Sequence, residues 1–494
     1  MKILISTMFC LIATIGYSQS DVDLVRKTVD QNMIKGQIHF LALDALKGRD
    51  TGSPGLELAA DFIKSQFRSF GVEYAPGMDT YLQPVPLTMV TAPTTSSVII
   101  ADQTLNNPDD FIILQADNIA LTGELIFLGF GLEADLEGKD VEGKIIVANA
   151  GDGEAESPQA WFAISQEKNM MAMAKGAKAV VEIYSNTKAP YNFVKRFLNA
   201  RDRLNLGKDE NANVLTHIMI DGSQEDLVKQ FKTVGTTLDI NIDGVTKDEF
   251  TSDNIVGYVE GTDPILKDEI VVYSAHYDHV GIGQADAVGD TIYNGARDNA
   301  VGTTTVLSAA ENIATYPTKR SAIFILFTGE EKGLLGSKWY VDHSPVPLED
   351  IVYCFNSDNG GYNDTSLASI IGLTRTTAQP LIEEACSTFG LKAIEDPAKE
   401  QGLFDRSDNV NFAAKGIPAP TFSLGFTAFD EEMMKYYHQA GDHADNLDYD
   451  YLYKFFQSYV LAARSIGNME VKPFWLEGDK YYEAGVELYQ GKDD

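Results

Sequence analysis

Apolar runs typical of buried β-strands recur in the second half of the chain, and each ends in front of polar residues. These runs are residues 269–273, 321–327 and 351–355. The polar residues that follow them are His276, then Glu330 and Glu331, then Asp358. In open α/β sheets, ligands bind outside the carboxyl ends of the strands. The pattern therefore predicts an α/β fold in which these side chains meet at one edge of a sheet.

The first half of the chain has a different pattern. Residues 55–70 carry the apolar spacing of an amphipathic helix, after a turn-rich loop at residues 46–53. A Thr/Pro/Ser-rich stretch at residues 91–97 predicts a hinge. Beyond it, to about residue 248, short strand-like runs alternate with glycines and acidic turns. We therefore expect a second, β-rich domain inserted into the first.

Five side chains with metal-binding groups follow predicted strands or begin helices: His276, Asp298, Glu331, Asp358 and His438. Each alone is ordinary, since an Asp at the start of a helix is usually a cap. Together, two imidazoles and three carboxylates form a mixed nitrogen and oxygen set that suits two zinc ions sharing a carboxylate. Glu330 adds a carboxylate beside a candidate ligand. The set indicates a hydrolase.

The strings around these residues resemble the dizinc exopeptidases of clan MH, which include secreted bacterial aminopeptidases, glutamate carboxypeptidases and glutaminyl cyclases. The resemblance runs through residues 275–281, 294–302, 328–337, Ser407-Asp408 and Tyr437-His438. It implies a three-layer α/β/α zinc-exopeptidase domain with a mixed central sheet. The β-rich insert resembles a protease-associated domain.

The resemblance also implies how the ligands divide between the metals. His276 and Asp358 would bind one zinc ion, Glu331 and His438 would bind the other, and Asp298 would bridge the two. Cobalt and manganese suit similar ligand sets. The peptide bond after Asp298, to Asn299, is expected to be cis.

Three further residues would serve the reaction. Asp278 would accept a hydrogen bond from the second ring nitrogen of His276 and so fix its tautomer. Glu330 would be the general base towards a metal-bound water and would then deliver the proton to the leaving amine. Tyr437 would donate to the developing oxyanion, although an ordinary packed aromatic is an equal alternative.

Other polar residues receive no chemical role. His279 and His443 flank the motifs and are expected to line the rim of the site. A hydrolase with a Ser-His-Asp triad is disfavoured because the chain contains no Gly-x-Ser-x-Gly motif.

The N-terminus has the pattern of a signal peptide over residues 1–18, with Lys2, an apolar stretch and a small-residue cleavage site. We therefore expect a secreted or periplasmic protein. Removing that segment leaves 38 basic residues (39 minus Lys2) against 72 acidic ones, a net charge of −34. Such a charge makes nucleic acid and anionic membranes improbable partners. Cys354 and Cys386 could pair or stay as two buried thiols.

The predicted organisation follows from these parts. The domains are a signal peptide at residues 1–18, a discontinuous catalytic domain at 21–95 and 249–470, a protease-associated insert at 96–248, and a C-terminal tail at 471–494.

The function expected first is hydrolysis at the N-terminus of peptide substrates. No basic residue follows Gly416-Ile417, where relatives that capture a C-terminal carboxylate carry arginines, although Arg375 and Arg406 could still reach the pocket. A carboxypeptidase or dipeptidase is the alternative, as is glutaminyl cyclisation on the same scaffold. A receptor without activity is disfavoured because all five ligands and the base are present.

Overall fold

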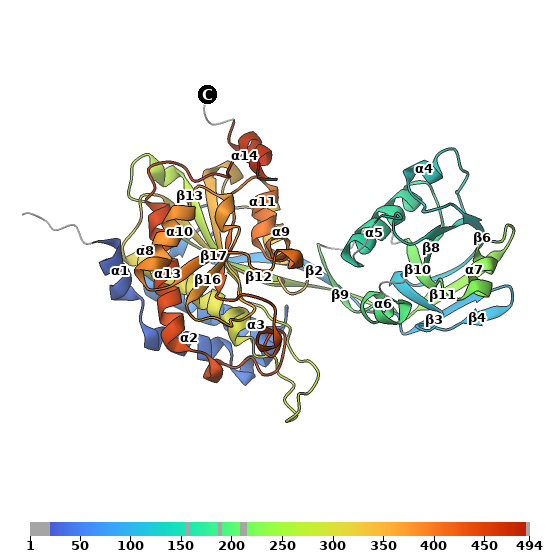
Figure 1. The fold of residues 1–494 in the computed structure, drawn as a ribbon, viewed down its shortest axis with the longest axis horizontal. Helices are drawn as coiled ribbons and strands as arrows, with labels where there is room; N and C mark the ends of the chain where they lie inside the picture. Colours follow the sequence, from blue (N-terminus) through green and yellow to red (C-terminus); the bar gives the residue numbers. More distant parts are fainter. Residues whose placement is uncertain (1–19, 155–157, 186–189, 208–214, 491–494) are drawn as a thin grey trace, which may run out of the picture. The chain divides into compact units, whose positions relative to one another are not determined.

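The computed structural model describes residues 20–154, 158–185, 190–207 and 215–490. The chain forms two compact units, Met1–Val85 with Thr251–Asp494 and Pro86–Phe250 (Figure 1). The boundaries fall within strands β2 (Leu82–Val90) and β12 (Lys247–Val259). The predicted signal peptide lies outside the described residues.

A mixed sheet forms the centre of the larger unit, in the order β17-β16-β18-β15-β13-β14-β12-β2, with β1 paired to β12. The strands are β1 (Glu73–Tyr74), β13 (Ile270–His276), β14 (Ser321–Phe327), β15 (Ile351–Ser357), β16 (Leu367–Ile371), β17 (Lys392–Glu395) and β18 (Thr421–Leu424). β13 pairs in parallel with β14 and β15, and β15 pairs in parallel with β18. β12 pairs antiparallel with β14, and β16 antiparallel with β18.

Both faces of this sheet are buried. In β13, Val271 and Tyr273 belong to one hydrophobic cluster, whereas Ile270 and Val272 belong to another. This alternation follows from the two-residue period of a strand. The first cluster includes side chains of α1, α2, α3, α8, α10 and α13, and the second includes side chains of α9, α11 and α12. The three-layer α/β/α architecture is confirmed.

The helices of the larger unit are α1 (Asp21–Thr28), α2 (Gln31–Leu41), α3 (Pro54–Phe70), α8 (Gly302–Thr315), α9 (Leu335–Asp342), α10 (Gln379–Thr388), α11 (Asn409–Ala414), α12 (Glu431–Met434), α13 (Tyr449–Gly467) and α14 (Tyr482–Tyr489). The predicted helix at residues 55–70 corresponds to α3. Ser53 caps its N-terminus by accepting from the Leu56 N–H, and Gly71 ends it in the left-handed conformation.

The smaller unit contains an eight-stranded sheet in the order β4-β3-β11-β6-β7-β8-β10-β5. Its elements are β3 (Thr95–Ile100), β4 (Gln103–Leu105), β5 (Phe111–Gln115), β6 (Ile119–Phe127), α4 (Glu133–Leu136), β7 (Ile145–Asn149), α5 (Pro158–Ala174), β8 (Ala179–Tyr184), α6 (Tyr191–Leu198), β10 (Thr216–Asp221), α7 (Glu225–Phe231) and β11 (Thr237–Asp243). β9 (Arg203–Leu206) pairs with the second half of β2. That this unit is a protease-associated domain stays a prediction.

The segment set apart as a C-terminal tail is packed onto the larger unit as far as residue 490. Trp475 is 2 % exposed, and its indole N–H donates to the Gly416 carbonyl at 2.9 Å. Tyr489 of α14 donates to the Ile351 carbonyl at the start of β15. Aromatic side chains in a polar stretch supply this packing, and the division of the chain into domains, with a C-terminal tail at residues 471–494, stays a prediction.

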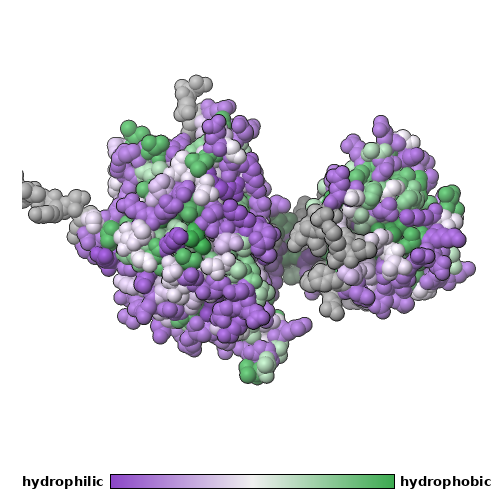
Figure 2. Space-filling model, in the orientation of Figure 1, coloured by the Kyte–Doolittle hydropathy of each residue, from purple (hydrophilic) through white to green (hydrophobic). Residues whose placement is uncertain are grey.

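The surface of the larger unit and its two cysteines bear on the remaining expectations. The viewed face of the larger unit carries mainly hydrophilic residues (Figure 2), and no described helix has the length and apolar character needed to cross a bilayer. Cys354 and Cys386 are both buried free thiols, so the second of the two alternatives for them is the correct one.

Candidate active site

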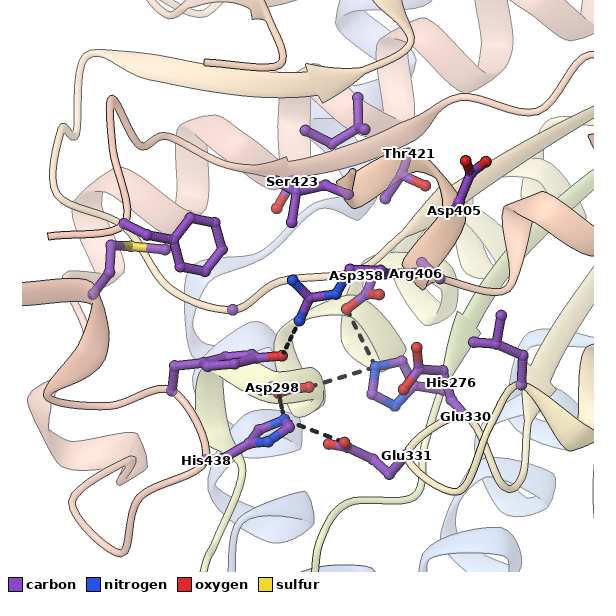
Figure 3. Close-up of a pocket in the computed structure, with 18 of the residues that line it drawn as sticks. His276, Asp298, Glu330, Glu331, Asp358, Asp405, Arg406, Thr421, Ser423 and His438 are labelled. Atoms are coloured by element: carbon purple, nitrogen blue, oxygen red, sulfur yellow. Dashed lines mark hydrogen bonds and ion pairs between the residues drawn. The ribbon is translucent and has the colours of Figure 1, made fainter. Parts of the chain in front are cut away.

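The carboxyl ends of three parallel strands bring the predicted ligands together. His276 is the last residue of β13, Glu330 and Glu331 lie just after β14, and Asp358 lies just after β15. Because neighbouring parallel strands end at the same edge of a sheet, these side chains share one space. Figure 3 shows them pointing toward one another, together with Asp298 and His438.

Asp298 lies in an irregular turn directly before α8. Its peptide bond to Asn299 is cis, as expected. The main-chain N–H groups of Arg297 and Asp298 both donate to a carboxylate oxygen of Asp442, at 2.9 and 3.2 Å. These contacts hold the turn so that the Asp298 carboxylate faces the strand ends.

The two oxygens of Asp298 face different imidazoles. Oδ1 lies 3.5 Å from Nε2 of His276, and Oδ2 lies 3.1 Å from Nε2 of His438. His276 Nε2 is also 3.2 Å from Asp358 Oδ1. His438 Nε2 is also 3.2 Å from Glu331 Oε2. The five predicted ligands thus form two groups with Asp298 in common (Figure 3).

The donor atoms fit a metal centre. Oxygen and nitrogen atoms of His276, Asp298 and Asp358 lie within 4.8 Å of one another, and so do those of His279, Asp298 and Glu331. Mixed imidazole and carboxylate sets of this kind suit zinc. The second group can draw its nitrogen from His279 or from His438. We favour His438 because it lines the pocket, whereas the His279 side chain is fully buried.

His279 does not lie at the rim as expected. Its Nδ1 is 2.8 Å from Glu331 Oε1 and 3.9 Å from Asp298 Oδ1. It therefore holds the Glu331 carboxylate in place. His443 is partly exposed, and its Nε2 lies 3.5 Å from Asp290 Oδ2. The signal for His279 was its place in the string His276-Tyr277-Asp278-His279, three residues after a ligand.

The main-chain carbonyl of Asp278, and not its carboxylate, makes the closer contact with the His276 ring. The Nδ1 atom of His276 lies 3.2 Å from the Asp278 carbonyl and 3.9 Å from the nearer carboxylate oxygen. The carboxylate instead accepts from the Glu330 N–H at 3.1 Å and from the Thr51 hydroxyl at 3.0 Å. The predicted contact is therefore corrected: a carbonyl receives the imidazole proton, and the carboxylate fixes the Glu330-Glu331 turn.

Burial and crowding of carboxylates perturb the protonation of the site. Burial raises the pKa of Glu330 well above its usual range, and the nearby Asp358 and Glu331 raise it further. Burial also disfavours the charged form of Glu331, but hydrogen bonds from His279 and His438 hold its pKa well below the usual range. Adjacent carboxyls with opposite pKa shifts are typical of catalytic sites.

The site opens into a cavity of about 380 Å³. Glu330, His276 and the other predicted ligands line it, together with six apolar side chains: Leu334, Ile371, Leu403, Phe426, Phe429 and Met433. Tyr437 also lines the cavity, and its hydroxyl accepts a hydrogen bond from Arg406 Nη2 at 3.3 Å.

The two arginines that could have reached the pocket differ. Arg406 is exposed and lines it. Arg375 instead pairs with Asp479 at 2.6 Å and lies over the rings of Phe404 and Trp475. Only Arg406 of these two is placed to meet a substrate.

Comparisons with known proteins agree with this geometry. Residues 254–462 match the model of peptidase family M28. Aminopeptidase YwaD of Bacillus subtilis is 27% identical over 75% of this chain and 74% of its own length. A probable leucine aminopeptidase 2 of Aspergillus oryzae is 24% identical over 71% of this chain and 69% of its own. An aminopeptidase structure from Aneurinibacillus sp. strain AM-1 has the same fold, with a TM-score of 0.61, 23% identity, and coverage of 90% of this chain and 95% of that one.

A three-layer α/β/α unit with carboxylates and imidazoles at its strand ends defines a metallopeptidase. The chain matches peptidase family M28 over residues 254–462, in agreement with the dizinc exopeptidases that its motifs resemble. This likeness indicates a peptidase, with peptides as its substrates.

Proposed function

We propose that the protein is an aminopeptidase with two zinc ions. His276 and Asp358 would hold one ion, Glu331 and His438 the other, and Asp298 would bridge them. The observation that carries this proposal is the Asp298 carboxylate, whose two oxygens lie 3.5 and 3.1 Å from imidazoles of different ligand groups. A shared carboxylate between two donor groups is the arrangement that a pair of cations requires.

When bound, the zinc ions would lower the pKa of a water molecule and polarise the scissile carbonyl. Glu330 takes the proton of that water, because its carboxylate lines the cavity beside the predicted ligands. It then donates the proton to the amine that leaves. The Tyr437 hydroxyl donates to the developing oxyanion, and the N–H group of Arg406 orients that hydroxyl.

The lining of the cavity supports recognition of the N-terminal residue of a peptide. Phe426, Phe429 and Met433 line the same cavity and suit an apolar first side chain. The two curated relatives are named as aminopeptidases, which also supports cleavage at the N-terminal end of the peptide.

A panel of leucine peptides tests this proposal. Free, N-acetylated and C-terminally amidated forms of one tripeptide are incubated with the zinc-loaded enzyme, and each released amino acid is identified. Acetylation should abolish release of the first residue, and amidation should change kcat/KM little. Loss of activity on amidation but not on acetylation would contradict the proposal. A substrate with N-terminal glutamine, assayed for ammonia, separates hydrolysis from glutaminyl cyclisation.

Arg406 favours a second candidate, a dipeptidase or carboxypeptidase. Its guanidinium lines the cavity and suits a substrate carboxylate. Under this alternative, the free dipeptide is cleaved at least ten-fold better than its amide, and Arg406→Met removes the difference. If Arg406→Met lowers kcat equally for both substrates, Arg406 serves Tyr437 and the aminopeptidase proposal stands.

We also propose that the enzyme is exported, on the pattern of residues 1–18. N-terminal sequencing of the mature protein should begin near Gln19, and an intact Met1 on extracytoplasmic protein would contradict export by cleavage.

A further inference from the structure

The turn-rich loop at residues 46–53 received no function in the sequence analysis, and it contacts the segments that carry the predicted ligands His276 and Asp298. Arg49 in this loop is 1 % exposed. Lys47, Gly48 and Arg49 all have positive φ values, of 48°, 71° and 49°. Gly48 is required at its position, because an added Cβ would lie 2.4 Å from the Gly281 carbonyl oxygen. Such a conformation persists only where the surroundings fix it.

The guanidinium of Arg49 binds main-chain carbonyls of two ligand-bearing segments. It donates to the Tyr277 carbonyl at 2.9 Å, next to His276. It also donates to the carbonyls of Asn294 and Gly295, at 2.7 and 3.0 Å, just before Asp298. Segments that are distant in sequence are thus connected through one side chain.

The main chain of the same loop continues this connection. The Arg49 carbonyl accepts from the His279 N–H at 3.0 Å, and the Gly48 carbonyl accepts from the Gly281 N–H at 3.1 Å. The strand end that carries His276 is therefore bound to the loop on both sides of Asp278.

Thr51 reaches the third ligand segment through Asp278. Its hydroxyl donates to Asp278 Oδ2 at 3.0 Å. The other oxygen of that carboxylate accepts from the Glu330 N–H at 3.1 Å. The Thr51 hydroxyl therefore holds the carboxylate that fixes the turn of Glu330 and Glu331.

The charge of Arg49 also suits its place. Burial lowers its pKa to about 10, which leaves the guanidinium charged at neutral pH. Asp298, Asp278, Asp442 and Glu331 are the acidic residues that act on it. A fixed cation behind this cluster offsets part of the repulsion among carboxylates that must all face one cavity.

We propose that Arg49 and Thr51 are positioning residues for the metal centre, holding the His276, Asp298 and Glu330-Glu331 segments in binding geometry. The inference rests on the proposed metal centre, but not on which end of a peptide is read. Loss of an outer partner of a metal ligand typically costs about 10–100-fold in metal affinity or activity. An ordinary buried hydrogen bond would affect folding stability and leave zinc affinity unchanged.

The test measures zinc affinity and stability separately. Zinc is titrated into metal-free wild type, Thr51→Val, Thr51→Ser and Arg49→Lys against a chelating dye, and the unfolding midpoint of each metal-free protein is recorded. Thr318→Val is the matched control, because the Thr318 hydroxyl is buried and donates to the Arg320 carbonyl at 2.9 Å, outside the three ligand segments.

We expect Thr51→Val to weaken zinc binding about 10–100-fold and to lower kcat with little change in KM. Its unfolding midpoint should fall no further than that of Thr318→Val. Thr51→Ser should restore zinc affinity, and Arg49→Lys should weaken it, since one ammonium cannot reach carbonyls on both sides of the cluster. Equal zinc affinity in wild type, Thr51→Val and Arg49→Lys would overturn the inference alone. A wild type that binds no zinc would contradict the proposed function as well.

Discussion

Glu330 and Asp298 both lie in the buried acidic cluster, yet the geometry gives them different tasks. The carboxylate of Asp298 is shared between two imidazoles. The Glu330 carboxylate interacts with its charged neighbours, among them His276 and Asp358, at long range, and its main-chain N–H donates to Asp278. Because its carboxylate is not shared between two imidazoles, it can accept and release a proton. The two residues should therefore respond differently to substitution.

Glu330→Gln should retain the bound zinc and lower kcat by about 10²–10⁴-fold, which is the usual contribution of a positioned base. Asp298→Ala should lose at least one zinc ion, because both donor groups depend on that carboxylate. Metal analysis and steady-state kinetics on the same preparations separate the two outcomes. Zinc loss in Glu330→Gln would make Glu330 a ligand, and two tightly held zinc ions in Asp298→Ala would contradict the bridge.

Protonation of the metal-free site gives a second prediction at this scale. Burial would lower the pKa of His438, but hydrogen bonds to Asp298 and Glu331 raise it to about 10. A group with a raised pKa stabilises the fold below its unfolded value, near 6.5 for His, and that stability is lost as pH rises through the folded value. Burial also raises the pKa of Asp278 to about 6 and that of Asp408 to about 7. Ionisation of these buried carboxyls lowers the stability of the fold, so their effect too is a loss of stability as pH rises.

The melting temperature of the chelator-treated protein should therefore fall between about pH 5 and pH 10. Zinc replaces the proton on His438, so the zinc-loaded protein should show a smaller fall. Differential scanning calorimetry across this range measures both curves. A metal-free protein that becomes more stable on the alkaline side would contradict the account.

At the scale of elements, the sequence predicted the strands well because each is covered on both faces. The apolar run at residues 321–327 coincides with β14, and β13 and β15 extend only a few residues beyond their predicted ends. Strands buried on both faces give continuous apolar runs, and the ligands follow where those runs stop.

The features that the sequence did not predict depend on contacts between residues that are far apart in the chain. Arg49 binds a carbonyl 228 positions away, and no local pattern indicates that. Similarly, the helix starting beyond Asp298 was expected, but the contacts of its preceding turn come from Asp442. His279 was assigned to the rim because its spacing alone does not say which way the ring points.

The packed C-terminal segment carries its own prediction. Trp475→Ala should destabilise the larger unit by about 3–5 kcal/mol, the usual cost of removing a fully buried large aromatic. Trp339→Ala is the matched control, because Trp339 is only half-buried and stacks on His343. Urea unfolding of both variants gives the comparison. Equal destabilisation would show that residues 471–490 contribute no more than a surface element.

At the scale of the molecule, the larger unit supplies every predicted ligand and Glu330, at or just beyond the ends of strands and in the loops that follow. The smaller unit has its own sheet and its own hydrophobic cluster. The net charge of −33 for the whole chain suits the proposed aminopeptidase activity, since long-range attraction brings cationic peptide ends toward the protein.

We propose that the protein, with two zinc ions held around Asp298, removes the first residue of a peptide. Zinc is added in steps to the metal-free protein, and release of leucine from an unblocked, amidated leucyl peptide is measured. Activity should rise until two equivalents are bound and then stay constant. Full activity with one equivalent, activity independent of zinc, or no release of leucine would contradict it.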